Sequence, residues 1–170
     1  IQIRELQVTY SIEDENGAWW LISSDGRAVE QVSLEKALGY TRVEGLVVRT
    51  PQPGQNVQAI PGQRVDPDDG SAVTVPQSEA DAQLAALTAI MTGLEENGII
   101  GKVSVIDVTD VNKLHLEYPQ LLTVRLGNAQ RMDYKLSYLA AASQKLAENQ
   151  GGELDLSLEY SEDAVFNAAR

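Results

Sequence analysis

The 170-residue chain contains no cysteine and a single histidine. The lack of cysteine excludes disulfide bonds, thiolate metal sites and cysteine nucleophiles. Basic residues are also scarce, because 13 Lys and Arg stand against 25 Asp and Glu and the formal net charge is −12. Nucleic acids and anionic lipid surfaces are bound by clusters of Lys and Arg. We therefore expect no nucleic-acid partner and no electrostatic docking to a membrane.

Long hydrophobic runs and targeting segments are missing too. No stretch approaches the length of about 18 apolar residues that indicates a transmembrane helix, and the first residues lack the pattern of a signal peptide. The chain begins at Ile1 without an initiator methionine, so we expect a fragment that does not itself insert into a membrane. Its length and its 43% of hydrophobic residues predict a single globular domain over residues 1–170.

Residue patterns that carry catalysis or bind metals are absent from the sequence. His115 alternates with leucines and has no second ligand at metal spacing. Asp66, Asp68 and Asp69 resemble a calcium loop, but their spacing is wrong and Gln77 stands where that loop needs glutamate. The sequence has no glycine-rich phosphate loop and no Gly-x-Ser-x-Gly elbow, and periodicity places no carboxylate pair on one cleft. We expect no enzymatic activity, no catalytic residue, no metal site and no cofactor.

The N-terminal half has the pattern of several strands followed by a long loop. Alternating or β-branched runs predict strands over residues 1–10, 18–23, 28–32 and 43–49, with an Asp-Gly hairpin turn at 25–26 and one helical turn over 33–38. Residues 51–77 contain five of the six prolines. This excursion is expected to be exposed and mobile, with short strands at 57–60 and 72–75.

The C-terminal half predicts two long helices separated by three strands. The first helix begins at Ser78 and ends at Asn97-Gly98, and its apolar stripe consists of Leu84, Leu87, Met91 and Leu94. Strands are expected over residues 102–109, 113–118 and 121–127. The stripe of the second helix consists of Met132, Leu136, Leu139, Ser143 and Leu146.

The final strand is predicted over residues 153–160, where leucines and a tyrosine alternate with polar residues. Because no long segment follows it, we expect this strand to lie unpaired at the edge of its sheet. The order of elements predicts an α+β domain. It would have a mostly antiparallel sheet, two main helices packed on one face and an open C-terminal edge strand.

Several short motifs in this order resemble one protein family. They are 105–110 (VIDVTD), 122–127 (LTVRLG), 133–136 (DYKL) and 154–157 (LDLS), preceded by Trp20-Leu21-Ile22 with Asp25-Gly26. Together they are similar to the extracytoplasmic β domain of the FtsQ/DivIB cell-division proteins. The resemblance covers most of the chain and is weakest over residues 50–75. It implies a full-length protein with one transmembrane helix and a POTRA domain, located on the extracytoplasmic face of the membrane at the division septum.

The resemblance implies a non-catalytic scaffold. Such proteins bind FtsB/DivIC-like and FtsL-like partners by strand addition at their last strand, and so recruit and regulate septal peptidoglycan synthesis. An open edge would also permit weak self-association. Proteobacterial members have an Arg-Tyr pair where this chain has Ser157-Leu158. Carried over by position, the partner-binding residues are Leu154, Asp155, Leu156, Ser157, Leu158, Glu159 and Tyr160, with Phe166 as an aromatic anchor.

Two alternatives remain open at this point. One is an extracytoplasmic module that binds cell-wall carbohydrate through Trp19 or Trp20 and the long loop. Adjacent residues of a strand point to opposite faces, so one tryptophan is expected in the core. The other alternative is a hydrolase with an unrecognised carboxylate pair. The first requires an accessible aromatic ring in a groove, and the second requires two facing carboxylates in a cleft.

Overall fold

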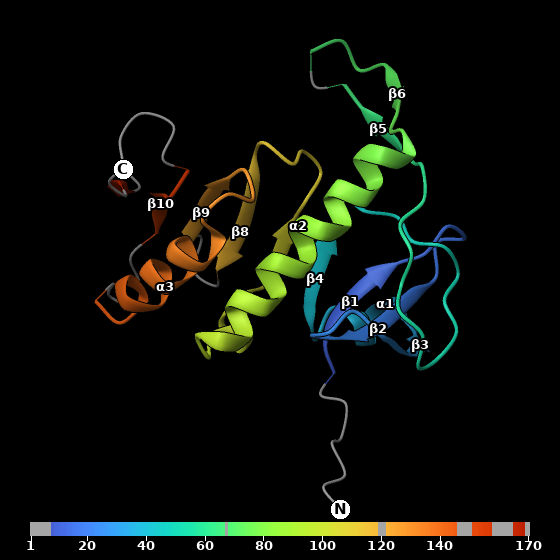
Figure 1. Cartoon of the computed structure of the whole chain (residues 1–170), viewed down its shortest axis with the longest axis horizontal. Helices are drawn as coiled ribbons and strands as arrows, with labels where there is room; N and C mark the ends of the chain where they lie inside the picture. The colour runs from blue at the N-terminus through green and yellow to red at the C-terminus, as the bar shows by residue number, and fades with distance from the viewer. Residues whose placement is uncertain (1–7, 67, 119–121, 146–150, 158–164, 169–170) are drawn as a thin grey trace, which may run out of the picture.

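The computed structural model describes residues 8–66, 68–118, 122–145, 151–157 and 165–168 (Figure 1). The helices are α1 (Leu34–Ala37), α2 (Gln77–Glu96) and α3 (Met132–Ser143), with a 3-10 turn at Ile100–Lys102. The strands are β1 (Val8–Glu13), β2 (Trp19–Ser23), β3 (Ala28–Val32), β4 (Thr41–Glu44), β5 (Gln63–Val65), β6 (Ala72–Thr74), β7 (Val105–Asp107), β8 (Leu114–Tyr118), β9 (Leu122–Gly127), β10 (Gly152–Asp155) and β11 (Val165–Ala168).

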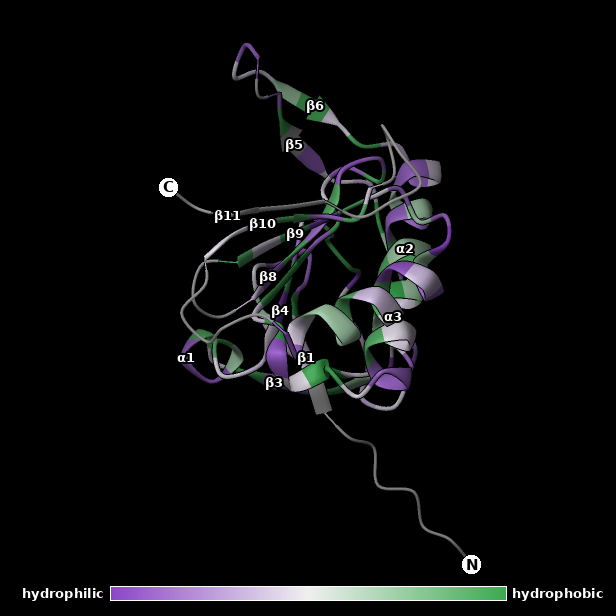
Figure 2. Ribbon diagram, turned by 90° about the vertical axis from the view of Figure 1, so that its left-hand side faces the viewer, coloured by the Kyte–Doolittle hydropathy of each residue, from purple (hydrophilic) through white to green (hydrophobic). Residues whose placement is uncertain are grey.

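The main sheet has nine strands in the order β11-β10-β9-β8-β7-β4-β1-β2-β3, and β5 and β6 form a separate ribbon. Most neighbours are antiparallel, and the parallel pairs are β1 with β4, β4 with β7, and β9 with β10. Helices α2 and α3 cover one face of the sheet, whereas α1 lies against the other face (Figure 2). The predicted α+β class, with two main helices on one face, is confirmed.

The core lies between the two long helices and the sheet. One buried row crosses five strands at Val43, Ile106, Leu116, Val124 and Leu154, which are paired in register. Helix α2 packs on this row through Leu87, Ile90, Met91 and Leu94, all fully buried. Alternation in the strands and the helical repeat in α2 therefore meet in one apolar layer.

Helices α2 and α3 approach closely at a glycine. A Cβ atom added to Gly93 would lie 2.3 Å from Leu136 Cδ1. Real Cβ atoms are not found at that separation, so the absence of a side chain at Gly93 lets Leu136 pack against α2. Both long helices can then contact the same sheet face.

The long excursion differs from the prediction. Val57, Ala59 and Val75 are only 5–6% exposed and belong to the core, so the segment is not exposed throughout. Residues 57–60 form no strand, while the expected strand at 72–75 is present as β6. The β5–β6 ribbon projects from the body of the domain (Figures 1 and 2). The prediction failed because prolines and glycines indicate turns but do not reveal which intervening side chains are buried.

The final strand also differs from the prediction. β10 ends at Asp155, and it is paired on both sides, with β9 in parallel and with β11 antiparallel. The predicted strand over 153–160 is therefore too long, and β10 is not the sheet edge. The edge strand at the C-terminal side is β11, whose four residues carry too short a pattern to be recognised beforehand.

Candidate functional site

The C-terminal end of the sheet contains most of the predicted partner-binding residues. Leu154 and Leu156 are 3% and 1% exposed, so their side chains belong to the core. Asp155 is half-buried and Ser157 is 8% exposed. Phe166 lies in β11, directly opposite Leu154. The predicted Leu158, Glu159 and Tyr160 lie outside the described residues.

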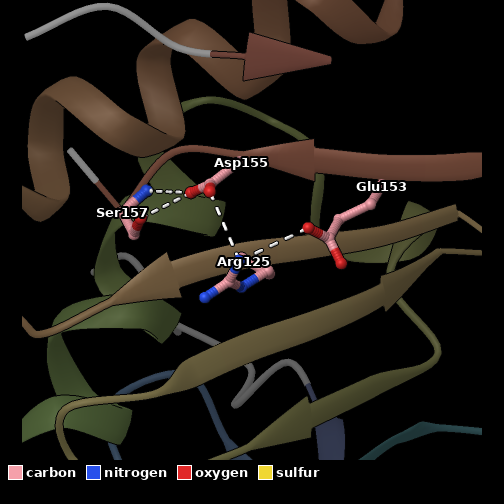
Figure 3. Close-up of polar contacts among 4 residues, drawn as sticks. All are labelled: Arg125, Glu153, Asp155 and Ser157. Carbon is pink, nitrogen blue, oxygen red and sulfur yellow. Dashed lines mark hydrogen bonds and ion pairs between the residues drawn. The ribbon is translucent and has the colours of Figure 1, made fainter. Parts of the chain in front are cut away.

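A set of polar contacts holds the solvent-facing side of β10 (Figure 3). Arg125 Nη1 on β9 lies 3.5 Å from Glu153 Oε1 and 3.4 Å from Asp155 Oδ2. Arg125 and Glu153 are about 40% exposed, so these long ion pairs contribute little to stability. The position of β10 against β9 is set by the parallel backbone ladder between them.

Asp155 also ends β10. Its Oδ1 accepts hydrogen bonds from the backbone N–H of Ser157 at 2.9 Å and from Ser157 Oγ at 2.5 Å. An aspartate that binds the backbone two residues ahead forms an Asx turn, which competes with continued strand pairing. The alternation seen in the sequence continues past Asp155, whereas β10 ends there and, among the described residues that follow, only the Leu156 N–H still bonds to β9.

The chain after β10 passes very close to the end of β9. Gly127 has φ +67°, and a Cβ atom there would lie 2.8 Å from Ser157 Cβ and 3.1 Å from Ser157 Cα. A residue with a side chain would be strained by this backbone conformation and would also clash with Ser157. Gly127 therefore determines where the chain leaves β10.

The hydrogen bonds made at β10 determine which way the backbone groups of β11 point. Leu156 N–H donates to Arg125 O of β9 at 2.8 Å, so Gly152 and Leu154 also direct their backbone groups toward β9. Backbone groups alternate along a strand, and Glu153 and Asp155 therefore face β11. The backbone N–H and C=O groups of their partners, Asn167 and Val165, therefore point toward β10. The backbone N–H and C=O groups of Phe166 and Ala168 consequently point outward, away from the sheet.

The opposite edge of the sheet is covered by part of the long excursion. Ala28 of β3 donates to Gln55 O at 2.9 Å and accepts from Gly54 N–H at 2.8 Å. Val57 N–H adds a bond to Gly26 O at 2.9 Å. These main-chain bonds occupy the outer side of β3 at its start. No described residue makes an equivalent set of bonds to the outer side of β11.

Lys135 on α3 is a buried cation that sequence reasoning did not select, although it lies in the DYKL motif. It is 1% exposed, and its Nζ donates to Leu126 O at 2.7 Å and Asn128 O at 2.8 Å. Burial lowers the pKa of Lys135, and nearby Arg131 lowers it further. Lys135 thus satisfies the carbonyl groups where β9 turns into α3, next to Gly127.

The two adjacent tryptophans have separate environments. Trp20 is buried, and its Nε1 donates to Asp14 Oδ2 at 2.9 Å. Trp19 is half-buried and lines a hollow of about 550 Å³ together with Gln63 and Val65 of the long excursion. The requirement of the carbohydrate alternative, an accessible aromatic ring in a groove, is met at Trp19.

The remaining polar candidates do not converge on a metal centre. His115 Nε2 lies 3.5 Å from Asp107 Oδ2, and both line a second hollow of about 450 Å³. Asp66 and Asp69 each accept a backbone N–H two residues ahead, from Asp68 and Ser71, as solvated turns do. Among the described residues, no group of three His, Cys, Asp or Glu side chains could hold a metal ion. The described residues also contain no helix that could cross a membrane.

The comparisons with known proteins place the chain in no family. No family model matches it, and no curated protein matches it. The relationship to FtsQ/DivIB proteins therefore depends on the short motifs of the sequence and belongs to the proposal below.

Proposed function

We propose that the chain is the extracytoplasmic β domain of an FtsQ/DivIB-type cell-division protein. In this proposal it is a non-catalytic scaffold at the division septum that binds FtsB/DivIC-like and FtsL-like partners. The partner adds a strand to the C-terminal edge of the sheet. The strand that receives it is β11, in place of the segment 153–160 that the sequence suggested.

The observation that carries the proposal is the difference between the two edges of the sheet. Unpaired strand edges are sites of unwanted association, and proteins usually cover them. Here backbone bonds from residues 54–57 cover the start of β3. The β11 edge has no such cover from the described residues and presents the backbone groups of Phe166 and Ala168. An edge that the described residues leave open, while the start of the other edge is covered, fits a surface used for strand addition.

The neighbourhood of β11 supports this use. β10 is held by β9 through a parallel ladder, by two core leucines and by the contacts of Arg125. A partner strand would therefore add to a fixed template, which lowers the ordering cost of binding. The family-like motifs at 122–127, 133–136 and 154–157 lie on β9, α3 and β10, the elements that position this edge.

The proposal is tested by titrating the chain with the extracytoplasmic C-terminal segment of an FtsB/DivIC-type protein in a calorimeter. Ala168→Pro removes an outward N–H with little change in side-chain volume. Losing one strand-addition hydrogen bond and disturbing its neighbours should weaken binding about tenfold. The Phe166→Ala variant separately tests the aromatic anchor.

The matched control is Asn167→Pro, which removes an N–H that points toward β10. It should lower the melting temperature of the isolated domain, whereas Ala168→Pro should leave it nearly unchanged. The idea fails if a folded Ala168→Pro variant binds the segment as tightly as the original chain. Leu156→Pro is not a suitable test, because the Leu156 N–H bonds to β9 within the domain.

A further inference from the structure

The hollow beside Trp19 is not explained by strand addition. It has a volume of about 550 Å³ and lies at the end of β4, between the long excursion and the start of α2, with Val75 and Gln83 in its lining. Volumes of about 300–1,000 Å³ are usual for small-molecule sites. The hollow is named the Trp19 hollow below, after the aromatic residue in its lining.

The fold places Trp19 on the sheet face opposite α2 and α3, which α1 covers in part. Trp19 pairs with Glu13 across the β1–β2 hairpin, and its neighbour Trp20 takes the core position beneath. The bond from Trp20 to the buried Asp14 fixes this choice of faces. A half-buried indole remains at the hollow and offers an apolar ring with a polar N–H.

An ion pair of planar polar groups on β4 also lines the hollow. Arg42 Nη2 is 2.7 Å and Arg42 Nε is 3.0 Å from Glu44 Oε1. These residues are two apart on β4, so they share the sheet face. The contacts use two of the five N–H donors of Arg42, and the side chains of the pair are 31% and 41% exposed. Donors of Arg42 and acceptors of Glu44 therefore remain for a ligand.

The far wall comes from the projecting ribbon. Gln63 and Val65 of β5 both line the hollow, and Val65 is 70% exposed. A β-branched apolar side chain at such exposure contributes little to the fold. Gln63 adds an exposed amide that can both donate and accept. Val65 and Gln63 thus offer an apolar side chain and a planar polar group, as Trp19 and the Arg42–Glu44 pair do.

The charges of the side chains that line the hollow limit which kinds of ligand can bind there. Glu13, Arg42 and Glu44 together carry a net charge of −1, within a chain of net charge −12. A polyanion would be repelled. Sugars present apolar C–H faces and hydroxyl edges without charge, and these match an indole ring beside planar donor–acceptor groups. We propose that the Trp19 hollow binds an uncharged oligosaccharide, stacked on Trp19 and hydrogen-bonded to Arg42, Glu44 and Gln63.

The shape of the surface favours a chain of sugars over a single ring. Thr109 lines both the Trp19 hollow and the second hollow of about 450 Å³, which extends over β7, β8 and β9. The two hollows therefore meet at Thr109. A linear oligomer could occupy both and cross the strands.

The lining of the Trp19 hollow fits binding and not hydrolysis. Glu13 is exposed and Glu44 is 41% exposed, so both carboxyls face water. A glycosidase needs a carboxyl kept protonated by an apolar environment. This inference goes beyond the proposed scaffold function and does not rest on it, because Trp19, Arg42 and Gln63 lie on β2, β4 and β5, none of which pairs with β11.

The test uses the whole chain with two neutral probes, chitotetraose and cellotetraose, measured by calorimetry and by tryptophan fluorescence. Saturable binding of at least one probe is expected, with a fluorescence change because Trp19 is accessible. Trp19→Ala should weaken binding about tenfold or more, and Arg42→Gln should weaken it to a smaller extent. The control Tyr138→Ala removes an exposed aromatic ring on α3 and should leave the affinity unchanged.

Three outcomes would overturn the inference. The first is the absence of saturable binding of both probes at millimolar concentration. The second is equal affinity in a folded Trp19→Ala variant. The third is binding of an extended peptide in the hollow with no binding of sugar. Strand addition is scored separately, since Trp19→Ala should still bind the FtsB/DivIC-type segment and Ala168→Pro should still bind sugar.

Discussion

Replacing Gly127 by alanine tests the close passage of the chain at the end of β10. Two effects add at this position. The backbone angle φ of +67° disfavours any side chain by roughly 1–2 kcal/mol. The new Cβ would also lie 2.8 Å from Ser157 Cβ, and relieving such an overlap costs about 1–3 kcal/mol. We expect Gly127→Ala to lower the free energy of unfolding by about 2–5 kcal/mol.

The chain offers a matched control for the first of these effects. Gly98, after the end of α2, also has φ +67°, but a Cβ atom there would have no neighbour within 4 Å. Gly98→Ala should therefore measure only the free-energy cost of a side chain at this backbone angle. The difference between the two variants measures the clash with Ser157, and it should appear as a drop of about 2–4 °C in melting temperature per kcal/mol.

A double-variant cycle identifies the clashing partner. Ser157→Gly removes the Cβ that the new alanine would meet, so Gly127→Ala should be less destabilising in that background. The measurement is urea-induced unfolding of the four proteins, followed by circular dichroism. If Gly127→Ala were no more destabilising than Gly98→Ala, the reasoning about β9 and Ser157 would be refuted.

Three further predictions concern buried polar groups. Trp20→Phe leaves a buried carboxylate oxygen of Asp14 without its indole donor and should cost about 1–3 kcal/mol in urea unfolding, while Trp19→Phe should cost less. Gln83 Nε2 lies 3.0 Å from three carbonyl oxygens, so Gln83→Met should lower the melting temperature clearly, and an unchanged value would contradict the bonds. Burial raises the pKa of Tyr118 to about 12. The unfolded chain ionises this hydroxyl at a lower pH than the folded chain does. The free energy of unfolding should therefore fall as the pH rises from about 10 to about 12, and ultraviolet absorbance follows the ionisation.

The class of the fold could be predicted because side-chain periodicity reports burial. Leu87, Met91 and Leu94 recur at helical spacing and are all buried in α2. The alternation in β8 likewise places Leu114 and Leu116 in the core and His115 on the polar face. These elements are long enough for the pattern to exceed chance, and nothing in their surroundings overrides it.

The end of the sheet could not be predicted, because periodicity does not report which strands are paired. Leu154 and Leu156 alternate correctly and are both buried. The Asx turn at Asp155 nevertheless ends β10, and the backbone of β11 pairs with β10. The sequence named Trp19 or Trp20 and the long loop as an alternative site, but not which tryptophan lines a hollow, since Trp19 and Val65 come together only through the tertiary fold.

The long excursion explains how one sheet can have two different edges. A loop of this length carries an entropic cost, but that cost grows by only about 0.6 kcal/mol for each doubling of length. Its first part covers the start of β3 with backbone bonds from Gly54 and to Gln55. Its middle part anchors Val57 and Ala59 in the core, and its last part raises β5 and β6 beside Trp19. The bonds at the start of β3 leave β11 as the sheet edge that the described residues do not cover, and the β5–β6 ribbon lines the Trp19 hollow. The same segment therefore bears on both proposed binding surfaces.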